Sequence, residues 1–298
     1  MWAILGIIAA VLLGVYDVFK KTSLSNNAVI PVLLISVSTS AIIYLPFILG
    51  SRFEPEFLQS INLYIPQPTA REHLLVFLKA VIVLSSWILS FFAIKHLPLT
   101  FVTPIRATGP LWTLLGALII FSEHLNTLQW AGITITLIFF YLFSTTGKLE
   151  GIHFRKNKWV FLIILATLFG SASGLYDKYI VSTTNRLIVQ VWSGIYQMVL
   201  MIIIFAFLWY PKRRKNTPFT WRWSIPLIGV FLILTDFFYF YALSDPDALI
   251  SILSGIRRSG VVISFVFGAI FLKENNIRKK SFYLAGIIIG VLLMVLGS

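Results

Sequence analysis

The chain has 298 residues, of which 58% are hydrophobic and 12% are charged, and its mean hydropathy is +0.90. A soluble domain is about 45–50% apolar and about 25% charged, so this composition excludes an ordinary soluble protein. It predicts a protein that lies in the lipid bilayer. The formal net charge of +13 does not indicate nucleic acid binding, because most of the basic residues lie in short loops between apolar segments.

Ten apolar segments predict an all-α membrane protein with ten transmembrane helices. A helix needs about 20 largely apolar residues to cross about 30 Å of hydrocarbon. The first segment has no basic n-region and no small-residue cleavage site, so we expect a span rather than a signal peptide. The predicted spans are residues 2–20, 28–49, 74–94, 99–121, 128–146, 158–181, 187–209, 223–243, 248–272 and 281–297.

The distribution of Lys and Arg between the loops predicts the orientation. The loops after the odd-numbered spans carry sixteen basic residues, whereas the opposite loops carry three. Loops rich in Lys and Arg stay on the cytoplasmic side of a membrane. We therefore expect a multi-pass protein of the inner or plasma membrane with both termini outside.

The chain repeats two short motifs. Residues 14–17 (Gly-Val-Tyr-Asp) recur as residues 174–177 (Gly-Leu-Tyr-Asp), and residues 106–109 (Arg-Ala-Thr-Gly) recur as residues 257–260 (Arg-Arg-Ser-Gly). The motifs lie in the first, sixth, fourth and ninth predicted spans. Because five spans are an odd number, the second half must enter the membrane in the opposite sense. We therefore expect two inverted five-helix repeats, with a site near the midplane between them.

This organisation resembles the drug/metabolite transporter superfamily, particularly its EamA-type members. The resemblance covers nearly the whole chain, as repeats at residues 1–147 and 148–298, with Glu123 and Glu274 closing the fourth and ninth spans. It implies a transporter that works by alternating access.

Two segments also resemble the triose-phosphate and nucleotide-sugar translocators. These are residues 101–110 and 254–262. In that family a lysine stands at the position of Arg106 and a Lys-Arg pair at Arg257 and Arg258, and the resemblance implies that the three residues hold the phosphate of an exchanged metabolite. EamA-type exporters of amino acids and other zwitterions share the scaffold, so they remain the alternative.

The same three arginines are the candidate substrate-binding residues on physical grounds. Arg106, Arg257 and Arg258 lie inside predicted spans. Guanidinium costs about 2.5–3.5 kcal/mol at the centre of a membrane helix, so each needs an anion, a carboxylate or a water-filled cavity. The alternatives are snorkelling of Arg106 to the interface and ion pairing of the other two.

Two acidic and two aromatic residues complete the candidate site. Asp236 is expected to form an ion pair with Arg257 or Arg258, or to carry protons, and the ion pair is favoured because unpaired charges of both signs would be costly. Asp177 is a second candidate for coupling or charge balance, with interface anchoring as its alternative. Tyr239 and Tyr241 are candidate substrate contacts, with packing against lipid or protein as their alternative.

Signatures of enzymes are absent from the sequence. The chain has no cysteine, its four histidines fall in or near loops without metal-ligand spacing, and there is no phosphate-cradling glycine-rich loop. We expect no enzyme activity, metal or cofactor. The predicted function is secondary transport of a small organic anion, with phosphorylated metabolites among the candidates, coupled to protons or to a counter-solute.

Overall fold

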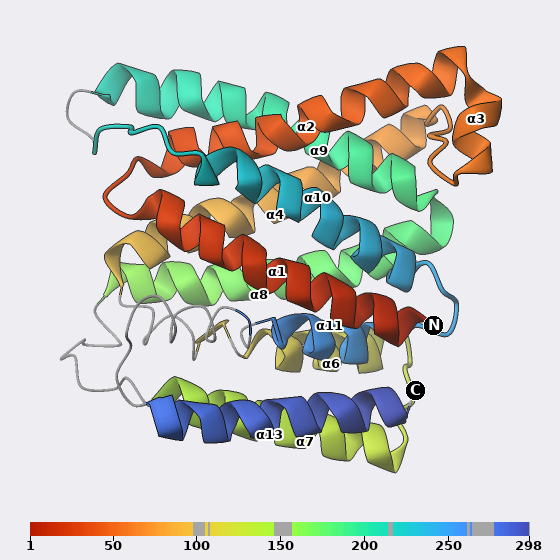
Figure 1. The fold of residues 1–298 in the computed structure, drawn as a ribbon, viewed down its shortest axis with the longest axis vertical. Coiled ribbons are helices and arrows are strands. Elements are labelled where there is room, and N and C mark those ends of the chain that lie inside the picture. Colours follow the sequence, from red (N-terminus) through yellow and green to blue (C-terminus); the bar gives the residue numbers. More distant parts are fainter. Residues whose placement is uncertain are drawn as a thin grey trace.

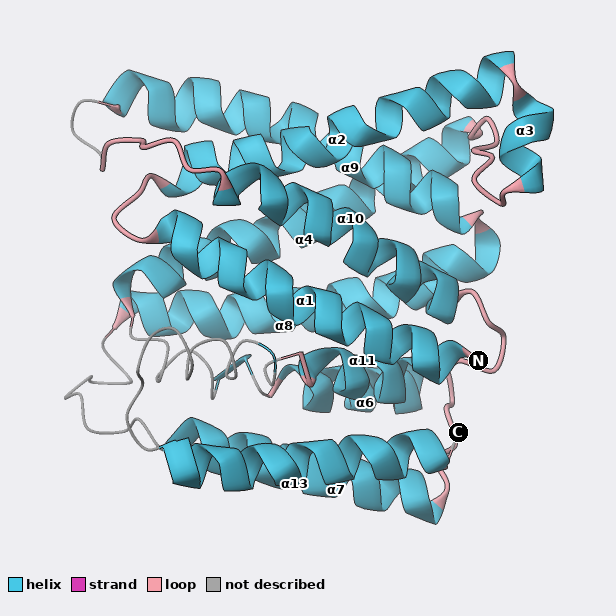
Figure 2. Ribbon diagram, in the orientation of Figure 1, coloured by secondary structure: helices cyan, strands magenta, loops and turns pink. Residues whose placement is uncertain are grey.

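The computed structural model describes residues 1–97, 105–106, 108–145, 157–213, 217–260, 263 and 277–297, and all regular elements in these ranges are helices (Figure 2). Six described stretches are long and apolar enough to cross a membrane. They are α1 (Trp2–Leu24), α2 (Val29–Phe53), α4 (Ala70–His96), α8 (Lys158–Thr183), Arg186–Lys212, which begins with α9 (Arg186–Ile204), and α10 (Ser224–Leu243).

Four further helices take the places of the other predicted spans. They are α6 (Gly109–Ile120), α7 (Thr127–Thr145), α11 (Ile250–Arg258) and α13 (Ile277–Leu296), and the additional short helix α3 (Pro55–Ser60) follows α2. The predicted spans 99–121 and 248–272 lie partly outside the described residues. The all-helical membrane fold is confirmed.

Several helices are longer than predicted, and in α4 and α1 polar side chains form hydrogen bonds in the added turns. The α4 helix begins at Ala70 rather than residue 74, because Thr69 and Glu72 form a capping box in which the Glu72 carboxylate accepts a hydrogen bond from the Thr69 amide at 2.7 Å. The α1 helix continues to Leu24, and the hydroxyl of Ser23 in its last turn lies 2.6 Å from that of Ser224 on α10.

The helix contacts are preserved when the first five spans are exchanged with the last five. The α1 helix packs against α10 and α11, and its counterpart α8 packs against α4 and α6. The α2 helix contacts its counterpart α9, α6 contacts α11, and α7 contacts α13. In Figure 1, α1 runs from the end of the bundle that carries both termini, and α8 runs in the opposite direction. This is the arrangement of an inverted repeat.

Small residues allow some of these helices to approach closely. A Cβ atom on Gly132 of α7 would lie 2.7 Å from the carbonyl oxygen of Gly290 on α13, so the two backbones meet without intervening side chains. Between α2 and α10, the Ser40 hydroxyl donates to the carbonyl of Gly229 at 3.1 Å. Close approaches between helix backbones therefore contribute to holding the bundle together.

Candidate substrate-binding site

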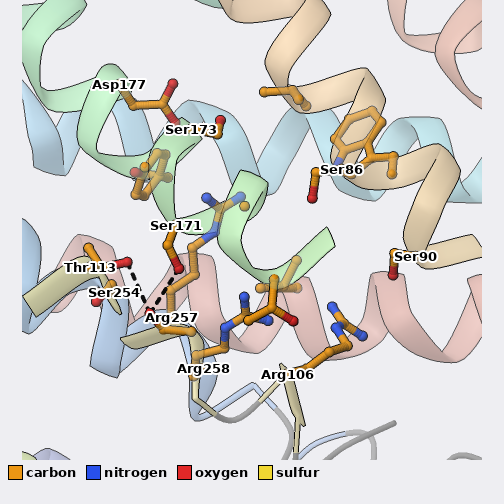
Figure 3. A pocket seen from close by; sticks show the side chains of 18 of the residues that line it. Ser86, Ser90, Arg106, Thr113, Ser171, Ser173, Asp177, Ser254, Arg257 and Arg258 are labelled. Atoms are coloured by element: carbon orange, nitrogen blue, oxygen red, sulfur yellow. Dashed lines mark hydrogen bonds between the residues drawn. The ribbon is translucent and has the colours of Figure 1, made fainter. Parts of the chain in front are cut away.

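A cavity of about 180 Å³ lies among α1, α4, α6, α8, α9, α10 and α11 (Figure 3). On α1 it is lined from Leu13 to Lys20, which is the second half of that helix, and on α8 from Ile163 to Asp177. The cavity therefore extends from the middle of the bundle toward the end that carries the α1–α2 connection.

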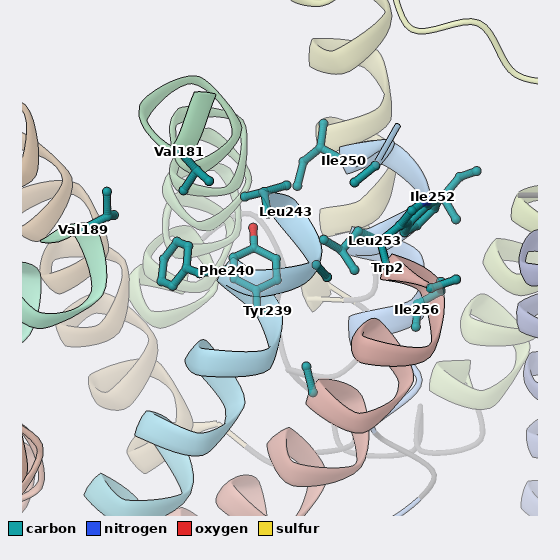
Figure 4. Packing of buried hydrophobic residues seen from close by; sticks show 14 of the residues in the cluster. Trp2, Val181, Val189, Tyr239, Phe240, Leu243, Ile250, Ile252, Leu253 and Ile256 are labelled. Carbon is teal, nitrogen blue, oxygen red and sulfur yellow. The ribbon is translucent and has the colours of Figure 1, made fainter. Parts of the chain in front are cut away.

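The other end of the bundle is closed by packed hydrophobic side chains (Figure 4). Trp2 from the start of α1 packs there with Tyr239 and Leu243 from the end of α10 and with Ile250 and Leu253 from the start of α11. These five side chains are at most 6% exposed. The cavity is thus closed by packed side chains at the end next to the termini, where Tyr239 both lines the cavity and belongs to this cluster.

Eight charged side chains of the described residues line the cavity. One carboxylate belongs to each of three helices, and the basic groups come from α1, α4, α11 and the segment before α6. They are Asp17, Lys20, Lys79, Arg106, Asp177, Asp236, Arg257 and Arg258. All of the arginines and aspartates proposed from the sequence are among them.

Arg257 and Asp236 form an ion pair. The distance from Arg257 Nη2 to Asp236 Oδ1 is 2.9 Å, and about a quarter of each side chain is exposed, 26% and 24%. The guanidinium carbon of Arg257 also lies 4.1 Å from the ring centroid of Tyr239, which is the geometry of a cation–π contact. Asp236 therefore neutralises Arg257, and Tyr239 covers one face of it.

Lys79 and Asp177 form a second ion pair, deeper in the protein. Lys79 Nζ lies 3.1 Å from Asp177 Oδ1, and the side chains are only 5% and 6% exposed. Lys79 also lies 5.0 Å from the ring centroid of Phe240. Lys79 was not among the predicted site residues, although its position as a basic residue inside a predicted span was a usable signal.

Arg106 and Arg258 lie side by side at one end of the cavity (Figure 3). Within the described ranges, neither has a carboxylate at ion-pair distance, and the two positive charges repel each other. Space for Arg258 is provided by Gly109, because a Cβ atom there would lie 3.2 Å from Arg258 Nη2. This pair of guanidinium groups is suited to binding an anion.

Lys20 is a third cation without a carboxylate partner among the described residues. Its side chain is only 5% exposed, and its ammonium lies 4.1 Å from the ring centroid of Phe91. Asp17 lies one helical turn earlier and lines the same cavity. The sequence placed Lys20 at the end of a span ending at residue 20, whereas α1 continues to Leu24 and carries Lys20 into the protein.

Hydroxyl groups form much of the remaining wall. Ser86 donates to the carbonyl of Ala166 at 2.8 Å, and Ser171 donates to the carbonyl of Gly109 at 2.9 Å. Because their protons are used within the protein, these oxygens are left to accept hydrogen bonds from a solute. The buried Ser90 hydroxyl has no partner among the described residues.

The structure does not bring Tyr241 to the cavity. Its ring lies 3.9 Å from the guanidinium carbon of Arg186, and 37% of the residue is exposed. Residues two apart on a helix point about 200° apart, so Tyr239 and Tyr241 cannot both face one cavity. Tyr239, at 2% exposure, is the tyrosine of this pair that lines it.

Comparison with known proteins identifies the family. The model of the EamA-like transporter family matches residues 1–145 and 157–296. No curated protein matches the chain. A solved crystal structure described only as a protein shares 14% identity with a TM-score of 0.71, covering 100% of this chain and 99% of its own, which shows a common fold. The chain therefore belongs to the EamA-like transporter family and is a membrane transporter, not an enzyme.

Proposed function

We propose that this transporter carries a small organic anion across the inner or plasma membrane by alternating access, as a secondary transporter. The observation that supports this is the pair Arg106 and Arg258, which line one cavity side by side and have no carboxylate partner among the described residues. An anion between them would relieve their repulsion and accept charge-assisted, bidentate hydrogen bonds. Phosphorylated metabolites fit this chemistry because a phosphate group offers three acceptor oxygens.

The three arginines then have different roles. Arg106 and Arg258 hold the anionic group of the solute. Arg257 is already neutralised by Asp236 at 2.9 Å, so it contributes a polar surface beside the site rather than a free charge. Asp236 and Asp177 are the carboxylates that would balance charge or carry a proton during the transport cycle.

We propose that the cavity faces the cytoplasm. It extends toward the end of the bundle with the α1–α2 connection, which holds Lys20 and Lys21 nearby, and the closed end lies beside both termini. Basic connections stay in the cytoplasm, so the termini would lie outside. The opposite state would open the cluster around Tyr239 and Ile250.

An exporter of amino acids or other zwitterions is the alternative function, and Asp17 is the observation that favours it. Asp17 lines the same cavity and lies close enough to attract Lys20 and Arg258 electrostatically. An amine could bind Asp17 while a carboxylate binds the arginines. Competition in a binding assay between phosphate esters and amino acids separates the two functions.

The function is tested by transport into proteoliposomes with purified variants. Arg106→Gln and Arg258→Gln are expected to abolish anion-dependent uptake or exchange while the protein still folds, as checked by its thermal unfolding. Arg186→Gln is the matched control, because Arg186 contacts Tyr241 away from the cavity. Unchanged uptake in both cavity variants would contradict the site assignment.

A further inference from the structure

Two glycines of α8, Gly170 and Gly174, line the cavity about one helical turn apart. Among the described residues, the nearest atom to a Cβ atom on Gly174 would be Tyr239 Oη at 4.0 Å, and the nearest to one on Gly170 would be Ser86 Oγ at 3.4 Å. Both are ordinary contact distances. Side chains at these two positions would therefore extend into the cavity itself.

Glycines elsewhere in the bundle allow close packing instead. A Cβ atom on Gly132 would lie 2.7 Å from the carbonyl oxygen of Gly290, and one on Gly229 would lie 2.4 Å from that of Ser36, so side chains at these positions would collide with a neighbouring helix. Glycine is less favourable than alanine in the interior of a helix. On α8 the two cavity-lining glycines carry that cost, and what they provide is space in the cavity.

We infer that Gly170 and Gly174 are specificity-determining residues, which form a groove for the body of the solute and so limit its size. The body is the part of the solute other than its anionic group. The inference rests on the proposed transport of a small organic anion and adds where the rest of that anion lies. The groove begins beside the arginines, because Ser171 donates a hydrogen bond to the carbonyl of Gly109 at 2.9 Å, and a Cβ atom on Gly109 would lie 3.2 Å from Arg258 Nη2.

The groove ends at the buried ion pair. Asp177 lines the cavity three residues after Gly174 and pairs with Lys79 at 3.1 Å. From Ser171 to Asp177 the helix rises about 9 Å, at about 1.5 Å per residue. A solute held by the arginines therefore has about this length of α8 along which its body can lie.

Ser90 on α4 is an independent indication that a polar group binds in the cavity. The residue is 7% exposed and lines the cavity, and its hydroxyl oxygen has no hydrogen-bond partner among the described residues. A buried hydroxyl without a partner costs free energy. Ser86, one turn earlier on α4, is the residue that a Cβ atom on Gly170 would meet, and both serines lie on the cavity wall in Figure 3. A polar group on the body of the solute supplies the partner that Ser90 lacks.

The test measures stability and selectivity for solute size in the same variants. Without ligand, Gly170→Ala and Gly174→Ala should unfold at or above the temperature of the wild type, because alanine is favoured over glycine in a helix interior. Their affinity for solutes with a body should fall about tenfold or more, because the added methyl group overfills the groove. Affinity is measured from the ligand-dependent rise in unfolding temperature.

Two series of anions with bodies of increasing size serve as probes. One consists of inorganic phosphate, glycerol phosphate and glucose phosphate, and the other of acetate, glycerate and gluconate. In the series that binds, both alanine variants should lose affinity for the larger members and bind the smallest as the wild type does, because the smallest ion reaches only the arginines.

Two further variants control for general effects of adding a methyl group to a helix. Gly194→Ala on α9 should keep the wild-type affinities for all sizes, since its Cβ atom would meet Tyr44 at 3.4 Å and the residue does not line the cavity. Gly132→Ala should lower the unfolding temperature, because its Cβ atom would lie 2.7 Å from the Gly290 carbonyl oxygen.

The outcomes separate this inference from the proposed function. If the two α8 variants bind every anion as tightly as the wild type, anion binding stands and the groove is overturned. If both unfold well below the wild type, as Gly132→Ala should, the glycines are packing residues and the groove is also overturned. If amino acids bind and no anion does, the proposed function fails, and the groove stands only if the variants lose more affinity for glutamine than for alanine.

Discussion

Glu123 binds Ser251 across the interface between the two repeats. The Glu123 carboxylate accepts hydrogen bonds from both the amide and the hydroxyl of Ser251, the former at 3.2 Å, and from the amide of Ile250 at 2.7 Å. These amides belong to the first turn of α11, where the helix dipole favours a negative charge. Glu123 therefore caps a helix of the opposite repeat, at the closed end of the cavity.

Glu123→Gln is expected to destabilise the protein by about 2 kcal/mol, because it removes a charge that accepts several hydrogen bonds while the amides of α11 stay buried. Thermal or denaturant unfolding in detergent measures the change. Glu56→Gln is the control, since Glu56 is exposed on α3. Equal stability of the two variants would show that the cap contributes nothing.

The role of Glu123 illustrates what the sequence could not predict. It was expected to close the fourth span, and it does follow α6, but its partners lie 127 and 128 residues away in the chain. No local pattern reports such a contact. The capping box of Thr69 and Glu72, by contrast, is a local sequence signal. The prediction of spans from hydropathy did not use it and therefore began α4 too late.

The candidate site shows the same division between local and distant information. A charged side chain inside an apolar span is costly wherever the helices pack, so the sequence alone was enough to indicate these candidate site residues. They are Arg106, Arg257, Arg258 and Asp236. Which cation meets which carboxylate depends on how helices pack. For that reason the sequence left the partner of Asp236 open and did not assign Lys79 to the site, although 3.1 Å separates Lys79 from Asp177.

The Lys79–Asp177 pair gives a second prediction. Lys79→Met leaves a buried carboxylate without its cation, which costs about 3–5 kcal/mol, and the double variant Lys79→Met/Asp177→Leu should recover most of that loss. The matched cycle at Arg257 and Asp236 should show smaller single effects, because about a quarter of each side chain is exposed. Each cycle consists of two single variants and their double variant, and denaturant unfolding of these variants measures the coupling energy of each ion pair. Equal coupling in the two cycles would contradict the difference in burial.

Gly109→Ala tests the position of Arg258. The added methyl group would lie 3.2 Å from Arg258 Nη2, so the guanidinium must shift by a few tenths of an ångström. We expect the affinity for a bound anion to fall about threefold to tenfold, because charge-assisted hydrogen bonds depend on geometry. Thermal unfolding of the ligand-free variant separates this effect from a loss of stability, because Gly109 is the first residue of α6 and precedes Pro110.

The control for this prediction is Gly194→Ala on α9. Its added Cβ atom would meet Tyr44 at 3.4 Å, an ordinary contact, and Gly194 does not line the cavity. Anion affinity, measured from the ligand-dependent rise in unfolding temperature, should be unchanged there. An equal loss in both variants would assign the effect to general helix packing.

Tyr239 and Tyr241 provide the last prediction, because the two rings lie on one helix and contact different arginines. Tyr239 covers Arg257 at 4.1 Å inside the cavity, whereas Tyr241 contacts Arg186 at 3.9 Å and is partly exposed. A desolvated cation–π contact contributes about 2 kcal/mol, so Tyr239→Leu should slow uptake into proteoliposomes severalfold or more. Tyr239→Phe keeps the ring and should retain most of the uptake. Tyr241→Leu should transport like the wild type, since its ring faces away from the solute, and a loss there as large as that in Tyr239→Leu would place the substrate path on the other side of α10.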